Sequence, residues 1–291
     1  MKPAPFAYHD PRSINDLIGL LGRLENAKLL AGGQSLMPML NMRYVIPDHL
    51  IDLNRLPDLQ AVQHADGKLH IGAMTRQRSL QRDALVQQYC PILAEALGWV
   101  GHIQTRSRGT IGGSLCHLDP AAEQPGIVAL YDGELTIAGP DGTRQMAMRD
   151  WGLGFMMPNL APEEVLTRIS LTPWSEPHGH GFVEFARRHG DFAIVGAGSL
   201  LALDGAGLIK RAALVLVGVD IQPMRLHDAE QALIGQPAES ASFAAAAALA
   251  SQVEALSDAH ISSSYRQKLA GVMTRRALEL AADRARKARH V

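Results

Sequence analysis

Length, composition and charge describe an ordinary globular protein. The 291 residues are 47% hydrophobic and 20% charged, which excludes a disordered or fibrous chain and leaves room for two or three subdomains. Lys and Arg number 28 and Asp and Glu number 29, so no net positive charge is available to attract nucleic acid or an anionic membrane. We therefore expect no nucleic-acid partner.

The apolar stretches and the cysteines bear on location and metal content. No run approaches the roughly 18 to 20 apolar residues of a membrane-spanning helix, and prolines occupy the place of a signal-peptide core, so we expect no membrane span and a cytoplasmic protein. Cys90 and Cys116 are too few for a disulfide framework or for an iron–sulfur cluster within the chain. Any iron that this protein uses is expected on another chain.

The first 57 residues are expected to form a small lobe. Apolar positions repeat at helical spacing over 14–25, after the N-cap candidate Ser13, which predicts a helix. Residues 28–33 and 49–56 are typical of short strands, and the first of these ends in two glycines. This order differs from that of a standard dinucleotide-binding unit.

Residues 58–175 are expected to form a second, larger lobe. The sequence predicts strands at 68–74 and 165–171, helices at 79–86 and 92–100, and a hairpin turn at 140–142 with the sequence Pro-Asp-Gly.

The pattern of predicted strands and helices changes near residues 174–178, where we place a domain boundary. Strands are predicted at 181–188 and 210–219, whereas 191–203 fits a strand or a helix. Residues 226–287 are rich in helix formers with helical apolar spacing. We therefore expect a separate α+β domain over 176–291.

A glycine pair follows the predicted strand at 28–33, in the sequence AGGQS (Ala31, Gly32, Gly33, Gln34 and Ser35). Glycines permit backbone conformations that let several N–H groups converge on an anion, and the neighbouring amide and hydroxyl add side-chain donors. An ordinary glycine turn explains this stretch alone equally well.

A second glycine pair repeats this chemistry in TIGGS (Thr110, Ile111, Gly112, Gly113 and Ser114). Two glycine turns flanked by polar donors suit the two phosphates of a pyrophosphate better than one turn does. Neither GxGxxG nor GxxxxGK[ST] occurs, which disfavours a Rossmann dehydrogenase and a P-loop ATPase.

Polar residues follow the second glycine pair in the order Cys116, His117, Asp119 and Glu123. No second cluster at metal-ligand spacing accompanies them, so we expect no metal site, and adjacent cysteine and histidine side chains on an extended chain point apart. Glu123 is a candidate acceptor for hydroxyl groups of a bound nucleotide, or a carboxylate that favours the start of a helix.

With both glycine pairs in place, the sequence resembles the FAD-binding medium subunits of molybdenum hydroxylases, which include carbon monoxide dehydrogenase and the flavin domain of xanthine dehydrogenase. Four stretches carry the resemblance, in the family's order and spacing and over nearly the whole chain: AGGQSLMPMLNMR (31–43), TIGGSLCHLDPAAEQP (110–125), APEEVLTRI (161–169) and RRHGDFAIVG (187–196). Two departures are Ser114, where Asn is usual, and Glu123, where Asp is usual.

The resemblance implies an α+β protein with a two-lobed FAD-binding fold of the vanillyl-alcohol-oxidase type over 1–175, followed by a C-terminal domain with a small antiparallel sheet and helices. It implies that residues 31–35 and 110–114 embrace the FAD pyrophosphate and that Glu123 accepts from a hydroxyl. It also places Leu166 and Phe192 near the flavin, and His117 among the cofactor neighbours.

The resemblance further implies a heterotrimer, often dimerised, in which a large subunit carries the molybdenum cofactor and a small subunit carries two [2Fe-2S] clusters. This chain would pass electrons from the clusters through FAD to an acceptor and would contribute no catalytic residue of its own. Two alternatives remain open on the sequence: a self-sufficient FAD oxidase or reductase of the same fold, and a non-catalytic nucleotide-binding module.

Overall fold

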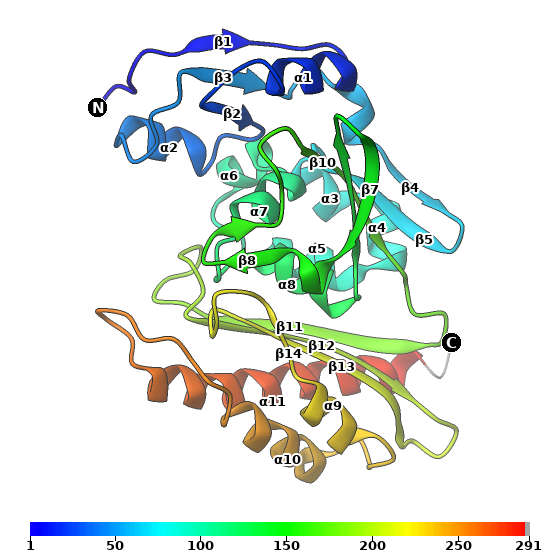
Figure 1. Cartoon of the computed structure of the whole chain (residues 1–291). Helices are drawn as coiled ribbons and strands as arrows, with labels where there is room; N and C mark the ends of the chain where they lie inside the picture. Colours follow the sequence, from blue (N-terminus) through cyan, green and yellow to red (C-terminus); the bar gives the residue numbers. More distant parts are fainter. Residues whose placement is uncertain (289–291) are drawn as a thin grey trace.

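The computed structural model describes residues 1–288, which form three parts stacked along one direction. A small N-terminal lobe lies at one end, a larger lobe of helices and an antiparallel sheet lies in the middle, and a four-stranded sheet backed by helices lies at the other end (Figure 1). The last three residues of the predicted C-terminal domain, 289–291, lie outside the described residues.

The N-terminal lobe is a parallel three-stranded sheet with two helices in its connections. The strand order is β1 (Ala7–His9), β3 (His49–Asp52), β2 (Ala27–Leu30), and the helices are α1 (Ile14–Leu21) and α2 (Leu36–Asn41). Ser13 caps α1, as expected, because its hydroxyl accepts a 3.1 Å hydrogen bond from the N–H of Asp16. Leu17 and Leu21 pack against Ile51 and close the core of this lobe.

The middle lobe contains a five-stranded antiparallel sheet. Its order is β4 (Val62–Ala65), β5 (Lys68–Gly72), β10 (Val165–Leu171), β6 (Glu134–Gly139), β7 (Gly142–Ala147). The hairpin expected at 140–142 is confirmed, and Gly142 provides the positive φ of +108° that its turn needs. A second, short hairpin joins β8 (Gly152–Gly154) to β9 (Met157–Pro158).

Helices cover this sheet, and one of them is shorter than the sequence indicates. The helix expected at 79–86 is broken at Asp83, whose carboxylate accepts from the N–H groups of Leu85 and Val86 and so starts a new helix. The helical elements are η1 (Pro57–Gln60), α3 (Gln77–Arg82), α4 (Ala84–Tyr89), α5 (Pro91–Leu97), α6 (Ile103–Arg108), α7 (Ile111–His117), α8 (Glu123–Leu130) and η2 (Met148–Asp150).

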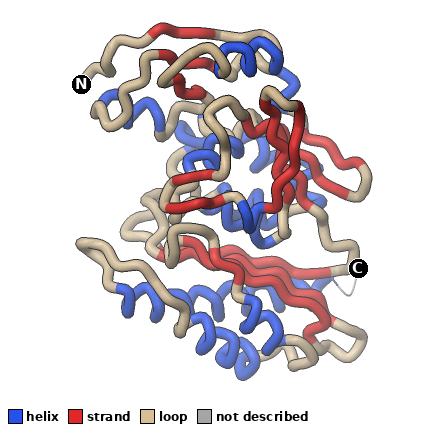
Figure 2. The backbone as a smooth tube through the Cα atoms, viewed as in Figure 1, coloured by secondary structure: helices blue, strands red, loops and turns tan. Residues whose placement is uncertain are grey.

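The C-terminal part is an antiparallel sheet with helices on one face (Figure 2). Its strands are β11 (His178–Phe185), β12 (Val195–Leu203), β13 (Ile209–Val217) and β14 (Met224–Arg225), and its helices are α9 (His227–Leu233), α10 (Ser240–Ala250) and α11 (Ser263–Ala288). The sequence of residues 191–203 fitted a strand or a helix, and the structure shows strand β12 there, buried at every position but its last. None of the helices within residues 1–288 is long and apolar enough to cross a bilayer.

Strand β11 joins the two halves, because it packs on α11 with one face and on the middle lobe with the other. A Cβ on Gly179 or Gly181 would meet the backbone of α11, so that face tolerates only glycine there. On the opposite face Phe182 is buried in the core of the middle lobe, and His180 lies 3.3 Å from the carboxylate of Glu95 on α5. The middle lobe and the C-terminal part are therefore packed directly against each other through β11.

Candidate functional site

The first glycine pair forms the turn between β2 and α2, as expected. Gly33 has φ +72°, the left-handed region that glycine occupies without strain. Among the described residues no acceptor is recorded for the backbone N–H groups of Gly32, Gly33, Gln34 and Ser35. The turn therefore offers unused donors to an anion.

The second glycine pair is not a turn, which corrects the expectation. Gly112 and Gly113 lie in the first turn of α7, and Thr110 is its N-cap, accepting a 3.0 Å hydrogen bond from the N–H of Gly113. Gly112 is required by packing, because a Cβ there would lie 2.6 Å from the Cβ of Ala73.

The backbone donors of this second segment are occupied within the fold. The N–H groups of Ile111 and Gly112 bond to the carbonyls of Thr75 and Ala73, and that of Ser114 bonds to Thr110. The hydroxyls of Thr110 and Ser114 are left as its donors.

The two glycine segments touch each other, although nearly eighty positions separate them in the sequence. A Cβ on Gly32 would lie 2.3 Å from the carbonyl oxygen of Arg108 and 2.7 Å from Cα of Gly109. A Cβ on Gly113 would lie 3.6 Å from the Cβ of Ala31. The contact thus brings the open N–H groups of the first segment beside the second segment, which carries the two hydroxyls.

A polar bridge that sequence reasoning missed ties the two segments together. Arg76 donates one guanidinium hydrogen bond to the carbonyl of Arg108 and another to the side-chain oxygen of Asn54. Asn54 in turn donates to the carbonyl of Ala31 at 3.1 Å. No motif marks these residues in the sequence, because each stands alone on a different element.

The bridge also places positive charge beside the turns. Burial lowers the pKa of Arg76, and the neighbouring Arg108 cation lowers it further. Two guanidinium groups thus stand at the edge of the two segments, where they would favour a phosphate or diphosphate.

His117 and Glu123 lie at the ends of neighbouring helices. His117 ends α7, and burial lowers the pKa of its imidazole while Asp119 opposes that shift. Glu123 is the first residue of α8 and is only 7% exposed, so the expected helix-start position is confirmed and the residue is buried as well. Burial and then the Glu184 carboxylate raise the pKa of Glu123 to about 8.

Leu166 and Phe192 occupy contrasting environments. Leu166 on β10 is buried in the core of the middle lobe, whereas Phe192 is 71% exposed in the loop after β11. That loop rests on the segment before α6, because the rings of His189 and Trp99 stack with centroids 5.6 Å apart. Phe192 therefore lies on an exposed loop of the C-terminal part, and this loop contacts the segment before α6.

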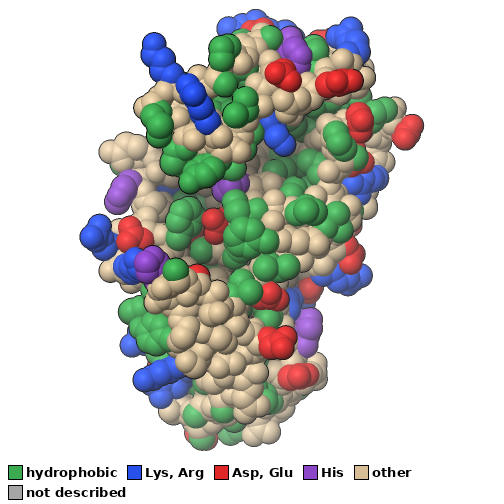
Figure 3. Space-filling model, turned by 60° about the vertical axis from the view of Figure 1, so that its left-hand side comes forward, with side chains coloured by type: hydrophobic (Ala, Val, Ile, Leu, Met, Phe, Trp, Pro, Cys, Tyr) green, Lys and Arg blue, Asp and Glu red, His purple; other side chains and the backbone are tan. Residues whose placement is uncertain are grey.

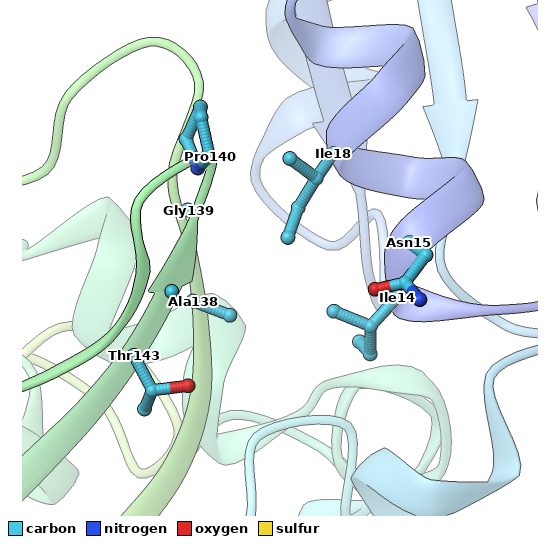
Figure 4. Close-up of a pocket in the computed structure, with 8 residues that line it drawn as sticks. Ile14, Asn15, Ile18, Ala138, Gly139, Pro140 and Thr143 are labelled. Carbon is cyan, nitrogen blue, oxygen red and sulfur yellow. The ribbon is translucent and has the colours of Figure 1, made fainter.

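Other candidate sites are weaker. Burial raises the pKa of the Cys116 thiol to about 12, which leaves no thiolate for nucleophilic chemistry. Within residues 1–288 no three His, Cys, Asp or Glu side chains gather in a way that could hold a metal ion. A cleft between α1 and the β6–β7 hairpin has no charged side chain in its lining and contains no residue of either glycine segment (Figure 4).

Two family models match the chain. Residues 4–174 match the FAD binding domain in molybdopterin dehydrogenase, and residues 180–281 match the CO dehydrogenase flavoprotein C-terminal domain.

Relatives match over nearly the full length. The chain is 38% identical to the 6-hydroxypseudooxynicotine dehydrogenase complex subunit alpha of Paenarthrobacter nicotinovorans, over 98% of this chain and 97% of the relative. It is 35% identical to the carbon monoxide dehydrogenase medium chain of Afipia carboxidovorans, over 98% of this chain and 100% of the relative.

Solved structures agree with the predicted fold. A chain of quinoline 2-oxidoreductase from Pseudomonas putida 86 superposes with a TM-score of 0.94 at 35% identity, over 98% of this chain and 99% of that one. A chain of carbon monoxide dehydrogenase from Hydrogenophaga pseudoflava superposes with a TM-score of 0.93 at 35% identity, with the same coverage. The chain therefore belongs to the family of FAD-binding medium subunits of molybdenum hydroxylases.

Proposed function

We propose that the two glycine segments together hold the pyrophosphate of FAD. The observation that supports this most directly is the contact of Gly32 with Arg108 and Gly109, which unites four free N–H groups with two hydroxyls. The proposed cofactor residues are Ala31, Gly32, Gly33, Gln34, Ser35, Thr110, Ile111, Gly112, Gly113, Ser114, His117, Glu123, Leu166 and Phe192.

Bound FAD would accept electrons and pass them to an external acceptor. This chain's own residues bind and orient the cofactor: the first turn supplies backbone donors, the second segment supplies hydroxyls, and Arg76 holds both in register. These roles are limited to holding the cofactor, which is consistent with a chain that transfers electrons while a partner subunit oxidises the substrate.

The partners we propose are a large subunit with the molybdenum cofactor and a small subunit with two [2Fe-2S] clusters, arranged as a dimer of heterotrimers in the cytoplasm. Exposed apolar side chains on the β8–β9 hairpin, Leu153, Phe155 and Met157, suit a chain that is covered by partners. Figure 3 shows further apolar groups distributed over one face of the molecule. We also propose domains at 1–175, with lobes at 1–57 and 58–175, and at 176–291.

The visible spectrum of the purified chain tests the cofactor. We expect flavin bands, or their appearance after addition of FAD. A chain that neither contains flavin nor takes it up would refute the proposal and favour a non-catalytic nucleotide-binding module.

Affinity purification from the native host tests the partners. We expect two further subunits, with molybdenum and iron in the eluate. A chain that purifies alone, loaded with FAD and active on a substrate, would instead establish a self-sufficient oxidase or reductase.

A further inference from the structure

Asp52 is a partly buried carboxylate at the end of β3 that the proposed function does not use. Its oxygen Oδ1 accepts a 2.8 Å hydrogen bond from the backbone N–H of Asn54 and a second one from the Asn54 side-chain amide. Its oxygen Oδ2 accepts from the hydroxyl of Tyr8 at 2.7 Å. Arg55, the residue after Asn54, pairs with Asp10 at 3.3 Å. The carboxylate of Asp52 is therefore committed to the amide of Asn54 on one side and to Tyr8 on the other.

The side-chain amide of Asn54 has partners of opposite character at its two ends. Its NH2 group faces two oxygens, one from the Asp52 carboxylate and one from the carbonyl of Ala31 at 3.1 Å. Its oxygen accepts from the guanidinium of Arg76. An amide turned by half a rotation would set its NH2 against the Arg76 donors and its oxygen against the two acceptors. Only one orientation of this amide therefore links Ala31 to Arg76.

Asp52 strengthens the preference for this orientation. Hydrogen bonds to a carboxylate are roughly twice as strong as those between neutral groups, and the carbonyl of Ala31 is neutral. An ionised carboxylate also has no donor that could serve a turned amide. The backbone N–H of Asn54 bonds to the same carboxylate oxygen, so the main chain and the side chain of Asn54 are held by one group.

We propose that Asp52 is a positioning residue for FAD binding, because it fixes the orientation of the Asn54 amide. Asn54 then holds Ala31 in the first glycine segment, and Arg76 holds the carbonyl of Arg108 before the second. The proposal rests on the FAD site described above and refines it. It extends the polar bridge to a carboxylate whose own hydrogen bonds, in the part of the chain that the structure describes, go to neither glycine segment.

The negative charge of Asp52 separates this role from a direct effect on the cofactor. Burial and the Arg108 cation lower the pKa of Arg76, and the Asp52 carboxylate opposes both, so its charge is felt at the bridge. A carboxylate that acted directly on the phosphates would repel them, and its removal would strengthen FAD binding. Removal of a carboxylate that acts through Asn54 weakens binding instead. The two roles therefore predict changes of opposite sign.

Titration of the full-length Asp52→Asn chain with FAD measures this sign. The substitution keeps the shape of the side chain and removes its charge. We expect the Kd to rise about tenfold, the effect of one weakened hydrogen bond to a charged group. Asp16→Asn removes the same charge from an exposed position of α1 and should leave the Kd unchanged. An unchanged or lower Kd in Asp52→Asn would overturn the proposal.

Asn54→Asp is a second variant that tests the orientation of the amide. It keeps the size of the side chain but replaces the NH2 group with an oxygen, which then faces the Asp52 carboxylate and the Ala31 carbonyl. We expect the Kd for FAD to rise by about tenfold or more. Wild-type affinity in a folded Asn54→Asp chain would contradict the proposal.

A double-mutant cycle shows whether Asp52 acts through Asn54. In a chain that carries Asn54→Ala, adding Asp52→Asn should change the Kd by less than about twofold, because no amide is left to orient. A further tenfold rise would show that Asp52 acts independently of Asn54, which would refute a positioning role.

Urea unfolding of the FAD-free chains applies the same cycle without the cofactor. Asp52→Asn and Asn54→Ala should each lower the midpoint of unfolding, and the double variant should lower it by less than the two shifts together. Additive shifts would mean that the two side chains do not interact, and the proposal would fail whether or not FAD binds. Failure of the wild-type chain to take up FAD would refute the proposed function instead, while the unfolding cycle would still decide whether Asp52 holds Asn54.

Discussion

Replacing Gly32 with alanine probes the contact on which the proposed cofactor site depends. The new Cβ would lie 2.3 Å from the carbonyl oxygen of Arg108 and 2.7 Å from Cα of Gly109, whereas ordinary contacts begin near 3.4 Å. Both atoms belong to the backbone, so no rotamer change can move them. The two glycine segments must therefore separate by about 1 Å. Loss of one or two hydrogen bonds to a charged phosphate costs about 1.5–3 kcal/mol each. We therefore expect the Kd for FAD to rise about 100-fold, or about 2.7 kcal/mol.

Fluorescence titration of the purified chain with FAD measures this change. Gly19→Ala is the matched control, since it adds the same methyl group to an exposed position of α1 with nothing within 4 Å. It should stabilise the chain by about 0.5–1 kcal/mol and leave FAD affinity unchanged.

Circular dichroism and urea unfolding distinguish a local effect on the site from loss of the fold. Wild-type affinity in a folded Gly32→Ala chain would refute the argument that the two segments must touch.

Three further predictions concern individual side chains. Arg76→Ala removes the two hydrogen bonds by which Arg76 links Arg108 to Asn54, so calorimetric titration should show the Kd for FAD rising about tenfold. A folded variant with unchanged affinity would contradict a role of this bridge in FAD binding. Glu230→Gln leaves Arg225 without its buried partner and should lower the free energy of unfolding in urea by about 3–5 kcal/mol, against less than about 0.5 kcal/mol for the exposed Glu279→Gln. Cys116→Ser should leave the flavin content and the iron signal of the assembled complex unchanged, and a lost iron signal would show that this thiol holds metal.

The sequence predicted most of the secondary structure and singled out both glycine segments, because glycine pairs beside apolar runs are local signals. The failure at Gly112 and Gly113 has a physical cause. Glycine is a poor helix former, so the pair indicated a turn, yet it lies in α7 because only glycine fits against Ala73.

The polar residues that the sequence did not reveal act through tertiary contacts. Arg76 and Asn54 lie on separate connections and meet only when the lobes pack. Glu184 stands in an alternating strand, where a charged residue is expected to face water, but β11 is covered on both faces. Neither kind of contact leaves a spacing in the sequence that could be recognised.

The pairing of Glu95 with Arg284 has a consequence for synthesis of the protein. The two residues are 189 positions apart, and Arg284 also donates to the carbonyl of His180, so this ion pair forms only after the last helix is made. At typical translation rates of about 5–20 residues per second, Glu95 waits roughly 10–40 s on the ribosome for this partner. Because α11 packs on β11 and β12, a nascent chain shortened before α11 would expose one face of the C-terminal sheet and is expected to need a chaperone.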